Sequence, residues 1–188
     1  MRRRRPQLVA TAEGIALAVL SGYVGTKAME PVSQKLYELE SVADRAREDA
    51  ARPGPPYRIA VEKLASLSGL HLDDAQLVRA ALVLHYGLAV SLAPVYMLLR
   101  RAAKRGPVTA ALVTGSAMSL VADELMTPAF GFSAPNLEYP LATHLRGIVA
   151  HLSFGLVVAA VNETAWWLLG HQPHMKTATT RDRRDSQR

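Results

Sequence analysis

The sequence predicts an all-α polytopic membrane protein, a four-helix transmembrane bundle with a short extracytoplasmic helical cap. Its apolar and charged residues are segregated into blocks, so a mean hydropathy of +0.07 conceals four long apolar stretches. Each stretch approaches the about 20 residues that a helix needs to cross a hydrocarbon core. Short runs of Arg and Lys flank the stretches, as helices oriented in a membrane require. Without water in that core, a segment satisfies its own backbone hydrogen bonds as a helix.

The predicted transmembrane helices cover residues 8–26, 76–99, 107–126 and 145–169. Four alternating spans place three basic segments on one side: the N-terminal segment 1–7, the loop 100–106, and the tail 170–188, which we expect to be disordered. The opposite loop, 127–144, contains neither Lys nor Arg. Because positive charge favours the cytoplasmic side, both termini are predicted to be cytoplasmic and the loop 127–144 extracytoplasmic.

The long loop 27–75 is predicted to form the extracytoplasmic cap. Within the segment 31–51, apolar residues recur at spacings of three and four, which is typical of an amphipathic helix, and a proline suits its first turn. The sequence RPGPP then interrupts the chain, and a second short helix is expected at 57–67. Asp73 or Asp74 follows as the N-cap of the next span.

Composition excludes several kinds of chemistry. The chain contains no cysteine, so disulfides, cysteine-ligated zinc, iron–sulfur clusters and thiol nucleophiles are excluded. The net charge of +6 resides in short basic runs without interleaved aromatic residues, so nucleic acid is not an expected partner. The expected partner is the lipid bilayer. A second copy of the chain or another membrane protein is the candidate protein partner.

Small residues four positions apart are predicted to mark the faces through which the spans pack, because helices in lipid associate by close backbone approach. The candidate packing residues are Gly14, Ala18, Gly22, Gly115, Ser119, Gly147 and Gly155. Such rows also arise by chance in alanine-rich helices, so each row is a hypothesis about one contact face.

Ionisable side chains within or beside the spans are the candidate functional residues. Such groups are costly in lipid, so they usually face protein or a water-filled cavity and mark a site. The candidates are Lys27, His85, Asp123, Glu124, His144, His151 and Glu163. Their positions in the spans predict that all except Glu163 converge in the outer half of the bundle, and that Glu163 lies nearer the cytoplasm.

Two interpretations of this cluster need no cofactor. Histidine titrates near neutral pH, which suits a polar relay or ion pathway that leads from the outer cluster to Glu163. The alternative is a hydrogen-bonded structural brace, in which Lys27 pairs with Asp123 or Glu124.

Two other interpretations involve a bound group. Imidazole and carboxylate groups suit a divalent metal such as zinc, although no tight ligand motif is present. His85 and His151 are candidate axial ligands of haem b, provided that their helices face each other. We predict no particular cofactor, beyond these two interpretations, and no catalytic residue.

Three further expectations concern the ends of the spans. Arg146 lies just inside the outer end of the fourth span and is expected to extend its charge to the interface. Trp166 and Trp167 are expected to form an interfacial belt. The opening MRRRR resembles the start of a signal peptide, whereas Glu13 and Lys27 disfavour cleavage. Whether the first span is ever cleaved stays open.

Several segments, taken in sequence order, carry a family resemblance. They are a small-residue first span with Lys27 near its end, HYGLAVSLAPVYMLL, GPVTAALVTGSAM, DELMTPAFGFSAP and HLRGIVAHLSFGLVVAAVNE. From Gly14 to Glu163 the chain resembles the YagU-like family of bacterial inner-membrane proteins, a domain of unknown function. His85, His151 and Glu163 match the family's pattern best, whereas the third span ends in two carboxylates in place of a histidine. The resemblance implies a bacterial inner (plasma) membrane and supplies no reaction.

The expected function is therefore that of a non-enzymatic membrane protein, either a pathway for protons or small ions or a component of envelope homeostasis. One alternative is a metal- or haem-dependent membrane enzyme or electron-transfer subunit. The other is a structural or assembly scaffold in a membrane complex.

Overall fold

The structure is a computed structural model that describes residues 7–171. Within that range the helices follow in the order α1 (Gln7–Leu39), α2 (Val42–Ala51), α3 (Pro56–Leu67), α4 (Asp74–Arg101), α5 (Pro107–Met118), the π-helix η1 (Ser119–Met126), α6 (Thr127–Ala129), the 3₁₀-helix η2 (Asn136–Glu138) and α7 (Leu141–Leu168). The described residues form no β-strand, in agreement with the predicted all-α class. The predicted basic segments at the two ends of the chain lie mostly outside the described residues.

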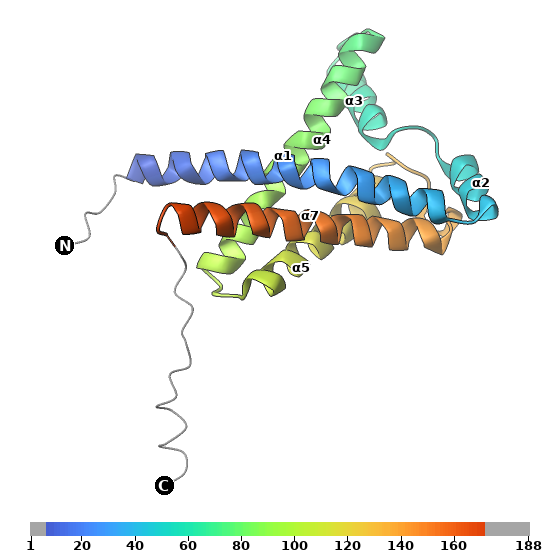
Figure 1. Cartoon of the computed structure of the whole chain (residues 1–188). Helices are drawn as coiled ribbons and strands as arrows, with labels where there is room; N and C mark the ends of the chain where they lie inside the picture. Colours follow the sequence, from blue (N-terminus) through green and yellow to red (C-terminus); the bar gives the residue numbers. More distant parts are fainter. Residues whose placement is uncertain (1–6, 172–188) are drawn as a thin grey trace.

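The long helices form one bundle. The helices α1 and α7 lie side by side and antiparallel, α5 packs against α7, and α4 crosses the pair obliquely while contacting α1 (Figure 1). The helix α3 packs on the first half of α4. We call the end that carries α2, α3 and η2 the cap end, and the end where α1 begins and α7 finishes the base end.

Three helical stretches of the described chain are long and apolar enough to cross a membrane: Asp74–Arg101, Pro107–Ala129 and Leu141–Leu168. The first two stretches contain the predicted spans 76–99 and 107–126. The third nearly coincides with the predicted span 145–169. Many of their large apolar side chains point away from the protein, as in Leu82, Val83 and Leu156, which are 53%, 72% and 47% exposed. Outward apolar surface of this extent suits helices that are surrounded by lipid.

The predicted first span lies within α1, but the predicted break after it is absent. The helix continues through Pro31 to Leu39, so the expected amphipathic helix at 31–51 is wrong as a single element. A proline in a helix interior removes one backbone hydrogen bond. Here the second half of α1 packs along α7, and Arg146 of α7 binds Glu40 just beyond the end of α1. These tertiary contacts compensate for the lost hydrogen bond. Because α1 continues to Leu39, the cap consists of α2 and α3.

Local signals fix where the other helices begin and end. Asp73 caps α4 through a reciprocal pair with Gln76: the Gln76 backbone N–H donates to Asp73 Oδ1 at 2.8 Å, and the Asp73 backbone N–H donates to Gln76 Oε1 at 2.8 Å. Gly69, just after α3, has a φ of 67°, a conformation that glycine adopts without strain. Pro107 occupies the first turn of α5, where a missing N–H costs little.

Two glycines allow α5 and α7 to touch through their backbones. A Cβ atom on Gly155 would overlap the carbonyl oxygen of Ala111, and one on Gly115 would overlap the carbonyl oxygen of His151. Gly22 plays the same part between α1 and α4, since its Cβ would lie 2.8 Å from Cα of Val90.

The other candidate packing residues differ in their surroundings. Ala18 and Ser119 are buried, at 6% and 0% exposure. Gly14 has no neighbour within 4 Å of the position of a Cβ, so it does not mark a contact face in the described chain. A Cβ on Gly147 would meet only Oδ2 of Asp123, at 3.7 Å, which leaves room beside that carboxylate.

Candidate functional site

The third apolar stretch widens into a π-helix where its two carboxylates lie. In η1 the hydrogen-bond step lengthens to five residues, so the backbone N–H of Thr127 donates to the carbonyl of Ala122. The π-helical turns in proteins occur frequently at functional sites. This turn places Asp123 and Glu124 against α7, where they face His151 and His144 respectively.

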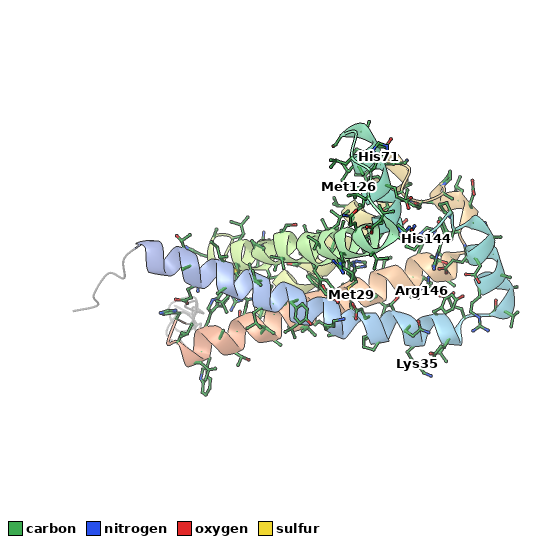
Figure 2. All side chains as sticks on the ribbon, turned by 90° about the horizontal axis from the view of Figure 1, so that it is seen from above. Met29, Lys35, His71, Met126, His144 and Arg146 are labelled. Atoms are coloured by element: carbon green, nitrogen blue, oxygen red, sulfur yellow. The ribbon has the colours of Figure 1, made fainter. Side chains whose placement is uncertain are left out.

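A cavity of about 450 Å³ lies at the cap end, enclosed by elements from most of the chain. Its walls come from α1, α3, α4, η1, α7 and the segment between α6 and α7. Figure 2 shows four of its lining side chains, Met29, Met126, His144 and Arg146, gathered at this end, while Lys35 points away from the bundle. Most of the wall is apolar, and the acidic and histidine side chains are confined to η1 and α7.

His144 lies between two hydrogen-bond acceptors, Glu124 and the backbone of Asn136. Nδ1 of His144 lies 2.7 Å from Glu124 Oε1, and Nε2 lies 3.1 Å from the carbonyl oxygen of Asn136. A neutral imidazole has a single N–H, whereas both of these partners accept hydrogen bonds. The tautomer of the ring therefore decides which of the two contacts is a hydrogen bond.

Asp123 is held more loosely. Nδ1 of His151 lies 2.8 Å from the Gly147 carbonyl oxygen, so this nitrogen carries a hydrogen, and it lies 3.3 Å from Asp123 Oδ2. No closer donor to the Asp123 carboxylate occurs among the described side chains. The His151 side chain is 6% exposed, whereas that of Asp123 is 39% exposed and lines the cavity. Asp123 is thus the acidic group with the most room for a ligand.

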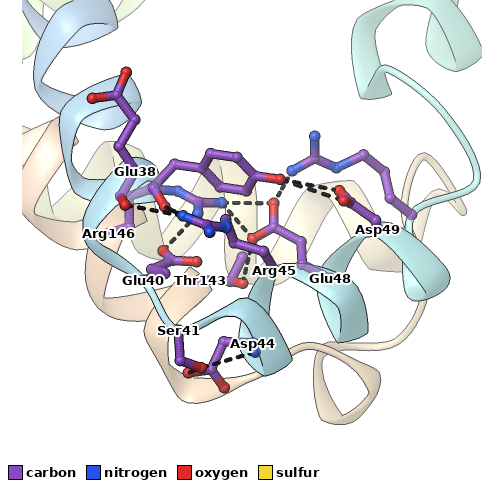
Figure 3. Close-up of polar contacts among 11 residues, drawn as sticks. Glu38, Glu40, Ser41, Asp44, Arg45, Glu48, Asp49, Thr143 and Arg146 are labelled. Carbon is purple, nitrogen blue, oxygen red and sulfur yellow. Dashed lines mark hydrogen bonds and ion pairs between the residues drawn. The ribbon is translucent and has the colours of Figure 1, made fainter.

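Arg146 forms the centre of a buried ion-pair network, shown in Figure 3, and does not extend to the interface as expected. Its guanidinium donates to Glu40 at 2.6 Å and to both oxygens of Glu48 at 2.7 Å. Glu48 is fully buried and also accepts hydrogen bonds from Thr143, at 2.7 Å, and from Arg52. The expected position was wrong because a buried carboxylate on α2 supplies a stronger partner than water.

Two of the predicted cluster residues lie apart from the cavity. Lys27 donates to Glu30 at 2.9 Å, and its Nζ stands 5.3 Å from the ring of Tyr86, so the predicted pairing with a carboxylate of the third span is wrong. His85 contacts the ring of Tyr57 edge-on, at 4.5 Å between centroids. His85 Nδ1 is buried without a hydrogen-bond partner among the described residues, and His85 is not part of the cavity wall that His151 lines.

Tyr57 is a cavity residue that the sequence did not single out. It lies in α3, and burial together with the nearby Asp123 carboxylate raises the pKa of its phenol well above the usual range. The phenol therefore stays neutral in the cavity wall. The only signal for Tyr57 in the sequence was its position in the short helix predicted at 57–67, which precedes the predicted span 76–99.

Glu163 belongs to a separate cluster at the base end. It accepts hydrogen bonds from Tyr96, at 2.8 Å, and from Arg100, whose Nε lies 2.5 Å from Oε1 and Nη2 2.9 Å from Oε2. Trp166 stacks on Tyr96 with centroids 6.2 Å apart and is 1% exposed, so the expectation that it forms an interfacial belt is wrong. Trp167 is 64% exposed, as a belt residue would be.

A packed apolar layer separates the two clusters. Met118, Phe154 and Val158 are at most 1% exposed and lie between the cavity and Glu163 along α5 and α7. The ring of Phe154 also fills the space beside Gly25, since a Cβ there would lie 2.7 Å from the ring. Asp123 and Glu124 lie at the cap end and Glu163 lies at the base end, and the polar groups do not form one continuous chain in the described structure.

The described residues contain no group of three or more His, Asp or Glu side chains arranged to hold a metal ion. The two acid–histidine pairs lie side by side, yet each histidine directs Nδ1 to its own carboxylate. No family model, no curated protein and no solved structure matches the chain.

Proposed function

We propose that this chain is a four-span protein of a bacterial inner membrane, with both termini in the cytoplasm, which binds a small molecule in its cap-end cavity from the extracytoplasmic side. The three long apolar stretches support the membrane setting. The basic loop 100–106 lies at the base end, and the loop 127–144 without Lys or Arg lies at the cap end. That distribution of charge favours a cytoplasmic base end. The YagU-like resemblance agrees with this location.

The cavity itself is the observation that carries the proposal. Ligand sites in proteins typically occupy about 300–1,000 Å³, with apolar walls and a few converging polar groups. The cavity at the cap end, at about 450 Å³, has this size and composition. Its acidic and histidine side chains all come from the π-helical segment and from α7, so a ligand meets these groups from two adjacent elements.

Binding accounts for the geometry better than conduction through the bundle. An ion or proton that left the cavity toward Glu163 would meet the layer of Met118, Phe154 and Val158. Glu163 is itself engaged by Arg100 and Tyr96. A protein that senses or sequesters a small molecule on the outer side of the membrane also fits a part in envelope homeostasis.

The absence of native cysteine makes topology and cavity access directly measurable. We would introduce Ser133→Cys, at a cavity-lining position, and Ala103→Cys, in the basic loop, and treat intact spheroplasts with a membrane-impermeant maleimide. The expected result is labelling at position 133 and none at position 103 until the membrane is permeabilised. Labelling of Ala103→Cys in intact spheroplasts would overturn the proposed orientation.

The same variants test binding. Six-carbon amphiphiles that enter the cavity should slow maleimide labelling of Ser133→Cys. Ser68→Cys, at the exposed end of α3 and outside the cavity wall, is the matched control and should label at an unchanged rate. If hexylammonium, hexanol and hexanoate all leave the rate at position 133 unchanged, the cavity is not a binding site for small molecules.

A further inference from the structure

The arginines in the cavity wall bring no net positive charge to it. Arg146 binds Glu40 and Glu48, and Arg52 also binds Glu48. The side chains of Arg146, Glu40 and Glu48 are 9%, 8% and 0% exposed, whereas that of Arg52 is 45% exposed. Both arginines line the cavity, and both guanidinium groups are paired with these carboxylates. Two guanidinium groups and two carboxylates therefore balance within the network.

The remaining ionisable groups of the wall are two carboxyl groups and two histidines. Glu124 is paired with His144, whose Nδ1 lies 2.7 Å from its Oε1. Asp123 has only the distant Nδ1–H of His151, at 3.3 Å, and that hydrogen already serves the Gly147 carbonyl. Asp123 is therefore the least compensated carboxylate at the surface of a largely apolar cavity.

The aromatic part of the cavity wall is suited to a cation as well. Tyr57, Phe132 and Tyr139 all line the cavity. The faces of aromatic rings attract cations, and Phe132 already has the Nζ of Lys63 at 5.7 Å from its centroid. Lys63 is fixed by hydrogen bonds to the Phe130 and Gly131 carbonyls, at 3.0 and 2.7 Å.

We propose that the ligand of this cavity is a monovalent organic cation, an ammonium group on a partly apolar body. The ammonium donates to the free side of the Asp123 carboxylate, next to the space left by Gly147. The apolar body contacts Leu84, Leu88 and Ala150, which line the same cavity. This inference rests on the proposed function, because it names the class of molecule that the binding site takes.

The test compares three probes of matched length at pH 7: hexylammonium, hexanol and hexanoate. Each is titrated against the rate of maleimide labelling of Ser133→Cys in the full-length protein in nanodiscs. Hydrogen bonds to a charged partner contribute about 1.5–3 kcal/mol, so hexylammonium should protect at concentrations roughly 10- to 100-fold lower than hexanol. Hexanoate should be the weakest of the three.

Asp123→Asn removes the charge while keeping the shape of the side chain. In Asp123→Asn combined with Ser133→Cys, the advantage of hexylammonium over hexanol should fall to about threefold or less. Glu138→Gln is the matched control, because it removes a carboxylate from the exposed end of η2, outside the cavity wall, and should leave the ranking unchanged. If Asp123→Asn fails to fold, the ranking of the three probes on the Ser133→Cys protein still decides the question.

The outcomes separate this inference from the proposed function. Protection by hexanol or hexanoate that equals or exceeds protection by hexylammonium would retain a binding cavity and overturn the cationic ligand. Protection by none of the probes would overturn both. Protection by hexylammonium that is unaffected in a folded Asp123→Asn variant would also overturn the assignment of Asp123.

An ammonium group can belong to a free amine or to the headgroup of a lipid. Nanodiscs of phosphatidylglycerol, with and without phosphatidylethanolamine, distinguish these sources. Slower labelling of position 133 in the presence of phosphatidylethanolamine identifies a lipid headgroup as the occupant. Labelling that responds to hexylammonium alone identifies a free amine.

Discussion

Arg100 and Glu163 join the base ends of α4 and α7 through two parallel hydrogen bonds, Nε to Oε1 at 2.5 Å and Nη2 to Oε2 at 2.9 Å. The Arg100 side chain is 6% exposed and that of Glu163 is 31% exposed. Removing one member of a buried pair leaves the other charge without compensation, and the partial exposure of Glu163 moderates the cost. Glu163→Gln should lower the free energy of unfolding by about 2 kcal/mol, measured by denaturant titration in micelles.

Arg100→Lys should also lower the free energy of unfolding, because a single ammonium cannot form the two parallel bonds. The control is Lys35→Ala, which breaks the exposed Lys35–Glu38 pair and should change the free energy of unfolding by less than about 0.5 kcal/mol. Equal losses for Glu163→Gln and Lys35→Ala would contradict the buried-pair interpretation.

The Arg146 network should hold α2 against the bundle. Glu48→Gln weakens the contacts to Arg146 and Arg52 while keeping the size of the side chain. We expect α2 to detach more often, so trypsin should cut after Arg45 or Arg47 several times faster than in the unmodified protein. Glu62→Gln, which alters an exposed pair with Arg58 on α3, should leave the rate of cleavage within α2 unchanged. Unaltered cleavage in Glu48→Gln would show that the network does not retain α2.

The backbone contact between α5 and α7 predicts a strong effect of a single methyl group. Gly155→Ala inserts a Cβ against the carbonyl of Ala111, so the two helices must separate. The free energy of unfolding should fall by about 3 kcal/mol. Gly87→Ala is the matched control, because no atom lies within 4 Å of its Cβ position, and alanine there should raise stability by up to about 1 kcal/mol. A neutral Gly155→Ala variant would exclude this close approach.

Tyr57 should make stability fall at alkaline pH. Burial first, and the Asp123 carboxylate second, raise the pKa of its phenol above the value of about 10 expected in the unfolded chain. The folded protein therefore keeps the proton when the unfolded chain loses it. The contribution of Tyr57 is complete below about pH 10 and is lost as the pH rises toward its folded pKa.

Denaturant titrations at pH 8 and pH 11, on the unmodified protein and on Tyr57→Phe, measure this contribution. The free energy of unfolding should decline more steeply between the two pH values in the unmodified protein. Other alkaline effects are common to both proteins and cancel in the comparison. Equal declines would show that the phenol of Tyr57 is not protected from ionisation.

The apolar stretches of the sequence were enough to predict three helices that the structure contains. The prediction 76–99 falls within α4, and 107–126 falls within the continuous helix Pro107–Ala129. Length and composition decide such elements locally, because a helix in lipid satisfies its own backbone. The Asp73 cap was likewise readable, since a capping box involves residues only three apart.

Two of the errors arose where a distant residue determined the outcome, and one where a neighbour on the same helix did. The proline at 31 suggested a helix start, but contacts with α7 keep α1 helical to Leu39. Lys27 was assigned to the third span and instead binds Glu30, a neighbour three residues away on the same helix. Arg146 was predicted to reach the membrane interface, because nothing in the sequence of its own span indicates that Glu48 on α2 is its partner.

The candidate site was predicted in outline. The sequence singled out Asp123, Glu124, His144 and His151, and the structure places them on one cavity wall. It did not predict the π-helix that orients the two carboxylates, because no local pattern of residues specifies that turn. The YagU-like resemblance stays a prediction.

A π-helical turn holds more residues than the regular turn it replaces, so η1 has the form that a one-residue insertion leaves in an ordinary helix. Deleting Leu120, which is 55% exposed, should return the segment toward about 3.6 residues per turn and change how Asp123 and Glu124 are presented to α7. The acidic wall would be altered although no acidic residue had been removed. The presentation of charge to the cavity thus depends on the backbone of this segment as much as on its acidic side chains.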